Sequence, residues 1–187
     1  MLTRLGIEAR ISSEPDDMRR ASKIVLPGVG AFDTGMNRLR ESGLAEPIRE
    51  RVIGDGVPLL GICLGMQFLA GGSAEGATKG LGWLDAEVVR FESPPGQNLK
   101  VPHMGWNYVE ARPGSPLFRD VPEPHRFYFV HSYHLVARRM SDVAAVATHG
   151  RPFVAAVEHG NVLGVQFHPE KSHRFGMQVF RNFATYY

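Results

Sequence analysis

A single cysteine stands between two glycines at a predicted strand-to-helix turn. Residues 58–67 read Pro-Leu-Leu-Gly-Ile-Cys-Leu-Gly-Met-Gln, and Cys63 is the only cysteine among 187 residues. The apolar run before it predicts a buried strand, and the residues after it predict the first turns of a helix. Small neighbours permit the strained turn that lifts a nucleophile clear of a sheet, and a helix N-terminus favours thiolate. The alternative, a buried core cysteine, would not need Gly61 and Gly65.

A histidine near the end of the chain can supply the base that a nucleophilic thiol needs. His168 follows the apolar strand-like segment 162–167, and Glu170 comes two residues later. Because residues two apart in an extended segment share a face, the carboxylate of Glu170 can accept the imidazole N–H of His168. The sequence therefore predicts Cys63, His168 and Glu170 as nucleophile, base and orienting group. The alternative is that His-Pro-Glu is only a turn after a strand.

Composition narrows the class of protein. Hydrophobic residues make up 43% of the chain, charged residues 21%, and the net charge is +2. These values are typical of a globular protein and give no sign of nucleic-acid or membrane binding. One cysteine excludes an intramolecular disulfide, and no spacing argues for a metal, so we expect no metal and no cofactor. The sequence contains no apolar run of about 20 residues and no signal peptide, so we expect a cytoplasmic protein.

The elements expected along the chain favour an α/β fold. The first part alternates strands and helices, which predicts parallel pairing. Its strands are expected at 7–11, 23–26 and 57–62, and its helices at 33–41 and 44–53. A glycine-rich loop at 71–82 leads to short strand-like segments at 83–91, 100–102, 106–111, 127–136, 143–148, 153–158 and 162–167. A terminal helix over 173–187 is expected to pack on the sheet. The whole chain, 1–187, is expected to form one domain.

Two motifs together resemble the signature pair of class I glutamine amidotransferases. They are Gly-Ile-Cys-Leu-Gly-Met-Gln at 61–67 and Gly-Val-Gln-Phe-His-Pro-Glu at 164–170. The segments 27–32, 102–107 and 129–133 narrow the resemblance to the glutaminase subunits of imidazole glycerol phosphate synthase, of histidine biosynthesis. The resemblance spans nearly the whole chain. It implies a flavodoxin-like three-layer sandwich, with a central mostly parallel sheet that continues in an antiparallel extension.

The resemblance also implies a reaction, the hydrolysis of glutamine. Cys63 would attack the carboxamide carbon, while His168, oriented by Glu170, would protonate the departing ammonia and then activate water. Backbone donors for the oxyanion would come from Leu64 and from the loop near Val29. The residues implied in glutamine binding are Gly30, Gln67, Glu75, His131, Ser132 and Tyr133. Among them, Glu75 would face the α-ammonium, and the backbone of 131–133 would hold the α-carboxylate.

A partner is implied as well, a cyclase subunit with a (β/α)₈ barrel fold in a heterodimer. Ammonia would pass directly into the barrel and be added to an aminoimidazole carboxamide nucleotide. The products would be imidazole glycerol phosphate and aminoimidazole carboxamide ribotide. The implied interface residues are Met104, Trp106, Asn107, Tyr133 and Lys171. Without the resemblance, Met104 and Trp106 would be taken as core residues.

The chain departs from the family at its start, because it begins inside the helix that normally follows a first strand and a glycine-rich loop. We expect either a longer working protein or an N-terminally truncated chain that is weakly stable or inactive, since a central strand contributes much of the stability of a typical domain. Three alternatives stay open. The chain could be a paralogue that feeds ammonia to a surface-sugar pathway, a hydrolase of peptides or thioesters, or an inactive docking subunit.

Overall fold

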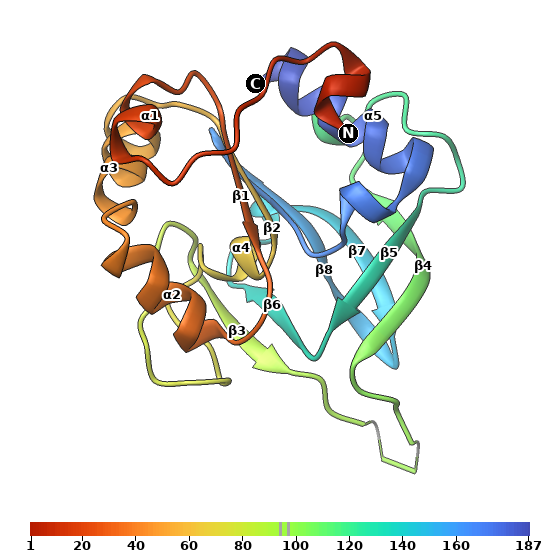
Figure 1. The fold of residues 1–187 in the computed structure, drawn as a ribbon. Coiled ribbons are helices and arrows are strands. Elements are labelled where there is room, and N and C mark those ends of the chain that lie inside the picture. The colour runs from red at the N-terminus through yellow and green to blue at the C-terminus, as the bar shows by residue number, and fades with distance from the viewer. Residues whose placement is uncertain (94, 97) are drawn as a thin grey trace.

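The protein, seen in a computed structural model, is an α/β structure in which residues 1–93, 95–96 and 98–187 are described (Figure 1). The α-helices are α1 Pro15–Arg20, α2 Phe32–Glu41, α3 Ala45–Arg49, α4 Leu64–Gln67 and α5 His173–Tyr186. The strands are β1 Ile24–Gly28, β2 Leu59–Cys63, β3 Ala86–Arg90, β4 His103–Ala111, β5 Arg126–His131, β6 Tyr133–Ala137, β7 Val143–His149, β8 Arg151–His159 and β9 Val162–Val165. Short turns of other helix types are η1 Leu2–Leu5, η2 Glu50–Gly54, η3 Pro116–Phe118, η4 Met140–Asp142 and η5 Pro169–Lys171.

The main sheet has a parallel part and an antiparallel part, in the order β1-β2-β9-β8-β7-β4-β5. The pairs β1–β2 and β2–β9 are parallel, and every later neighbour pair is antiparallel. A second, two-stranded sheet joins β3 to β6. Every residue of β2 and β9 is buried, as expected for strands covered on both faces. The predicted α/β fold with an antiparallel extension is confirmed.

Two clusters of apolar side chains cover the two faces of the main sheet and make three layers. One cluster joins the sheet to α5 and includes Ile62, Phe167 and Phe180. The other joins it to α2, α3 and the β3–β6 sheet, and includes Met36 and Leu59. Figure 1 shows α5 on one side of the sheet and α1, α2 and α3 on the other. The alternation of side chains along each strand is what allows one sheet to serve both clusters.

The strand predicted at 7–11 is wrong. Residues 7–14 run as an irregular segment, and the side chain of Ile11 is fully exposed. Alternating apolar residues form a strand only where a neighbouring strand accepts the ladder, and β1 is paired with β2 at the edge of the described sheet. The segment predicted at 106–111 is part of a longer strand, β4, which begins at His103, whereas the strand predicted at 100–102 is wrong, because these residues lie in a bend before β4. The segment predicted at 127–136 is divided at Ser132, where the chain leaves the main sheet for the β3–β6 sheet.

Candidate active site

Cys63 occupies a strained turn between β2 and α4. Its φ and ψ are 54° and −111°, a conformation that non-glycine residues rarely adopt. Three glycines bring α4 against the ends of β1 and β2. A Cβ on Gly28 would lie 2.6 Å from the backbone nitrogen of Gly65, and one on Gly61 would lie 2.7 Å from the oxygen of Gly65. A Cβ on Gly65 itself would overlap the carbonyl oxygen of Leu26. The glycines that flank Cys63 are therefore required by close backbone packing.

The imidazole of His168 lies between the Cys63 sulfur and the Glu170 carboxylate. Its Nδ1 is 2.6 Å from Oε1 of Glu170, which makes Nδ1 the donor and turns Nε2 toward the cysteine. Ser172 holds the backbone of this turn, because its Oγ donates to the carbonyl of His168 and accepts the N–H of Tyr128. No sequence pattern singled out Ser172, which is fully buried.

Electrostatics keep His168 protonated at neutral pH. Burial disfavours the charged imidazole, but the contacts with Cys63 and Glu170 outweigh burial and raise the pKa of His168 to about 9. The pKa of Glu170 is lowered: burial alone would raise it, and the contact with His168 more than offsets that effect. A histidine that contacts both a cysteine sulfur and a carboxylate is the arrangement that activates cysteine nucleophiles.

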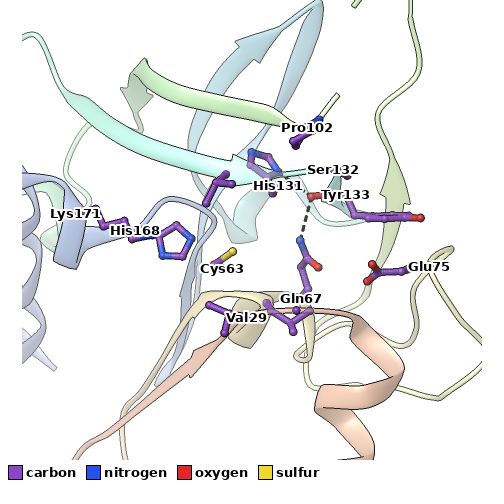
Figure 2. A pocket seen from close by; sticks show the side chains of 13 residues that line it. Val29, Cys63, Gln67, Glu75, Pro102, His131, Ser132, Tyr133, His168 and Lys171 are labelled. Atoms are coloured by element: carbon purple, nitrogen blue, oxygen red, sulfur yellow. Dashed lines mark hydrogen bonds between the residues drawn. The ribbon is translucent and has the colours of Figure 1, made fainter. Parts of the chain in front are cut away.

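A cavity of about 380 Å³ opens over these residues. Figure 2 shows the Cys63 sulfur at its floor, with His168 and Glu75 on opposite sides. The described residues that line the cavity are Val29, Gly30, Cys63, Leu64, Gln67, Glu75, Pro102, Val130, His131, Ser132, Tyr133, His168 and Lys171. This lining includes every residue for which the family resemblance implies a role in the oxyanion hole or in substrate binding. Glu170 stands behind His168, where an orienting group is expected.

The strand register brings the β1 loop to the cysteine. Gly28 is the partner of Cys63 in the β1–β2 ladder, so Val29 and Gly30 begin the loop beside the sulfur. The φ of Gly30 is 94°, which favours glycine, and the Val29 side chain is 81% exposed. Leu64 is the first residue of α4, and its N–H precedes the first intrahelical bond. Both segments therefore border the cavity that opens over Cys63.

A family model described as glutamine amidotransferase class-I matches residues 5–186. This chain belongs to that family. It is 49% identical over 184 residues, 98% of this chain and 90% of the relative, to imidazole glycerol phosphate synthase subunit HisH 2 of Pseudomonas aeruginosa. It is 43% identical over 183 residues to the HisH 2 subunit of Methanococcus maripaludis, again covering 98% and 90% of the two chains.

The fold of the chain is also similar to the folds of solved glutamine amidotransferase and glutaminase structures. A crystal structure of a glutamine amidotransferase matches with a TM-score of 0.68 and 25% identity, over 98% of this chain and 90% of that one. The glutaminase domain of Trypanosoma brucei CTPS with bound acivicin matches with a TM-score of 0.63, over 98% and 83% of the two chains. At 18% identity, that second likeness concerns the fold alone.

Within this amidotransferase site, Glu75 is held by a contact that the sequence did not predict. Its Oε2 accepts the N–H of Phe32 at 2.8 Å, at the start of α2. The loop that carries Glu75 is tied down by Asp33, whose carboxylate accepts the N–H groups of Ala77 and Thr78 at 3.1 and 3.0 Å. Both hydrogen bonds lower the pKa of Asp33, and the one from Ala77 has the larger effect. Asp33 is therefore the residue that positions this side of the cavity.

The residues predicted at a partner interface fall into three groups. Met104 and Trp106 project from one face of β4 and are 63% and 37% exposed, so neither is a core residue. Trp106 stacks on His173 with a centroid distance of 5.6 Å. Tyr133 and Lys171 line the cavity. Asn107 instead binds inward: its Nδ2 lies 3.1 Å from His103 and 2.8 Å from the carbonyl of Thr148.

The exposed aromatic surface on β4 extends beyond the residues that the sequence indicated. Tyr108 is 57% exposed on the same strand face, and the guanidinium of Arg126 lies over the rings of both Trp106 and Tyr108. Alternation along β4 decides which side chains share this face, and that alternation could have been read from the sequence once the strand bounds were known.

Within residues 1–93, 95–96 and 98–187, no three metal-ligating side chains gather closely enough to hold an ion. Among the helices of that same part of the chain, none has both the length and the apolar composition needed to cross a bilayer.

Proposed function

We propose that this chain is a glutaminase subunit that hydrolyses glutamine to glutamate and ammonia through Cys63, His168 and Glu170. The observation that carries the proposal is the contact of His168 with both the Cys63 sulfur and the Glu170 carboxylate at the floor of one cavity. A cavity of about 380 Å³ is large enough for one amino acid. The family to which the chain belongs supports the same chemistry.

The proposed reaction starts from a protonated His168 beside the Cys63 sulfur. The Cys63 thiolate attacks the carboxamide carbon, and the carbonyl oxygen becomes an oxyanion that accepts hydrogen bonds from the Leu64 N–H and the backbone near Val29. His168, protonated at neutral pH because its pKa is raised to about 9, gives its proton to the departing nitrogen, and ammonia leaves. Neutral His168 then takes a proton from water, whose oxygen attacks the thioester carbon. Glutamate leaves, and the thiolate–imidazolium pair returns.

Substrate contacts follow from the polar groups around the cavity. Gly30 and Gln67 lie on the side of the carboxamide, and the backbone of His131, Ser132 and Tyr133 holds the α-carboxylate. Glu75 faces the α-ammonium with the carboxylate oxygen that Phe32 does not bind. The position of Glu75 supports this orientation, because its anionic side chain lines the cavity and complements a positive α-ammonium.

We further propose that the partner is a cyclase subunit of imidazole glycerol phosphate synthase, with a (β/α)₈ barrel fold, in a cytoplasmic heterodimer. The HisH subunits named among the relatives support the histidine pathway. The exposed Met104, Trp106 and Tyr108 face supports a protein interface, since aromatic residues and Met are enriched there. Lys171 and Tyr133, the other implied interface residues, line the cavity, which suits direct delivery of ammonia to the barrel.

The test measures glutamate release from glutamine by the 187-residue chain, alone and with a HisF-type cyclase subunit and its nucleotide. We expect release that rises when the partner is present, and imidazole glycerol phosphate formed in equal amount. Cys63→Ala should abolish both, and the exposed variant Glu41→Gln should leave both unchanged. Glutamate release that persists in Cys63→Ala would overturn the proposed nucleophile. Glutamate release without cyclisation by any such partner would favour the surface-sugar paralogue.

A further inference from the structure

We propose that Gln166 is a further catalytic residue: its side-chain N–H donates to the Cys63 sulfur and stabilises the thiolate, and Gln67 positions it. The Nε2 of Gln166 lies 3.6 Å from Sγ of Cys63, within hydrogen-bonding distance of sulfur. Gln166 is fully buried beneath the cavity and is not among the residues that line it. Its amide therefore acts on the nucleophile without touching glutamine. The inference rests on the proposed function only in taking Cys63 as the nucleophile.

The direction of the hydrogen bonds is fixed by the carbonyl of Tyr133, which can only accept. The side-chain nitrogen of Gln67 lies 3.0 Å from this carbonyl, so that nitrogen is the donor (Figure 2). The same nitrogen lies 3.0 Å from Oε1 of Gln166 and donates its second hydrogen there. Because Oε1 of Gln166 is the acceptor, its NH₂ group must face the sulfur. Gln67 thus fixes which end of the Gln166 amide reaches Cys63.

Two neutral histidines, His131 and His103, continue the hydrogen-bonded chain on the other side of the Tyr133 carbonyl. Nδ1 of His131 lies 2.8 Å from the Tyr133 oxygen and must donate to it, which leaves its Nε2 as an acceptor. Nδ1 of His103 lies 3.0 Å from that Nε2 and donates to it. Nε2 of His103 then accepts from Asn107, whose own amide is oriented by the N–H of Tyr108. Every donor and acceptor from Asn107 to Cys63 is therefore assigned.

The burial of Gln166 indicates that its amide serves these hydrogen bonds. Its neighbours along the chain, Val165 and Phe167, are fully buried apolar residues, so the surroundings of this segment are apolar. A buried amide costs free energy unless it is hydrogen-bonded, and this one has partners at both ends. One partner is the reacting atom. A hydrogen bond to a charged acceptor is stronger than one to a neutral acceptor, so the donor favours thiolate over thiol.

The test measures alkylation of Cys63 by iodoacetamide between pH 5 and pH 10. Because Cys63 is the only cysteine, the modified fraction reports on that thiol alone. Gln166→Met conserves volume and removes the donor. We expect the midpoint of its alkylation profile to lie about one pH unit higher than in the parent chain, a tenfold loss of thiolate below the midpoint. Gln178→Met, the same change in α5 outside the cavity, should keep the parental midpoint.

Two further variants separate a positioning role from a general loss of structure. Gln166→Asn keeps a buried amide but shortens its reach, so the midpoint of its alkylation profile should also rise. If Gln166→Met does not fold, the midpoint of Gln166→Asn decides whether the amide acts on Cys63. Gln67→Met should also raise the midpoint, and the double variant should match Gln166→Met alone, because Gln67 acts through Gln166. Additive shifts would overturn the positioning role of Gln67. An unchanged midpoint in folded Gln166→Met and Gln166→Asn would overturn the whole proposal.

Kinetics give a second readout that separates the two proposals. If glutamine is the substrate, loss of the Gln166 donor should lower kcat about tenfold and leave KM nearly unchanged, since Gln166 does not line the cavity. If the chain releases no glutamate under any condition, the proposed function fails. The alkylation profile still decides the role of Gln166 in that case, because alkylation needs neither glutamine nor a partner.

Discussion

Gly65, at the start of α4, lies directly against the carbonyl oxygen of Leu26 in β1, so closely that any Cβ on Gly65 would overlap it. The oxygen belongs to the backbone of a strand paired with β2 and cannot move aside as a flexible side chain could. The close contact between Gly65 and Leu26 fixes the position of α4 against β1. Cys63, which directly precedes α4, therefore adopts a strained backbone conformation.

Gly65→Ala should therefore destabilise the protein. We expect the free energy of unfolding to fall by about 2–3 kcal/mol, because overpacking against backbone forces the elbow to shift. Urea unfolding followed by circular dichroism measures this change. The matched control is Gly54→Ala, because a Cβ on Gly54 would meet no atom within 4 Å. Equal stability of the two variants would contradict the packing argument.

Glu170→Gln should slow glutamine hydrolysis and change its pH dependence. Without the carboxylate, the pKa of His168 falls from about 9, so the alkaline limb of kcat/KM moves to lower pH. We expect kcat to fall by about 10²-fold, the scale of a misplaced general acid. Measurements of rate between pH 6 and pH 10 would check both effects. The idea fails if the alkaline limb stays in place, or if the exposed control Glu41→Gln behaves in the same way.

The same group makes stability depend on pH. His168 has a folded-state pKa above its ordinary value of 6.5, so the folded state binds its proton more tightly than the unfolded state does. The resulting stability is fully present below pH 6.5 and is lost as the pH rises through about 9. Glu170→Gln should reduce this alkaline loss, which urea unfolding at pH 6 and pH 10 would detect.

Asp33→Ala should loosen the loop that carries Glu75. Removal of the carboxylate leaves the N–H groups of Ala77 and Thr78 without their acceptor, so both amides should exchange hydrogen faster. KM for glutamine should rise about tenfold with a smaller change in kcat, because the loop positions a substrate contact rather than the nucleophile. Asp16→Asn removes an exposed carboxylate paired with Arg19 and serves as the control. Unchanged exchange at both amides would rule out Asp33 as the anchor.

The pair formed by His103 and His131 should make the protein sensitive to acid. Burial lowers the pKa of His103 to about 4 and that of His131 to about 3. The folded state therefore holds both rings neutral while the unfolded state binds protons below pH 6.5. Stability should decrease as the pH falls below 6.5 toward 4, by about 2 kcal/mol per histidine between pH 7 and pH 5.

Urea unfolding at pH 7 and pH 5 tests this acid sensitivity. His103→Gln should show a smaller difference between the two pH values than the parent chain, because one of the titrating rings is gone. His125→Gln should show the parental difference, since His125 lies outside the pair. A parental difference in His103→Gln would exclude this histidine as the source.

Local sequence patterns were enough to predict the chemistry of the site and most of the helices and strands. A glycine on each side of Cys63, and a carboxylate two residues after His168, depend only on neighbours along the chain. The structure places Cys63 and His168 in the lining of one cavity, and Glu170 within hydrogen-bonding distance of His168. Helix α2 and the terminal helix α5 lie within a residue or two of the predicted bounds, because their apolar periodicity and stop signals are local. The implied role of each residue at the cavity stays a prediction until it is measured.

Tertiary structure decided what depends on residues far apart in sequence. The strand predicted at 7–11 is absent because a strand needs a paired neighbour, which a local pattern cannot reveal. Asp33 became an anchor only through a loop more than 40 residues away. Gln166 was part of a recognised motif, yet its amide gained a role only when folding set it between Gln67 and the Cys63 sulfur. Hydrogen bonds have direction as well as distance, and direction exists only in three dimensions.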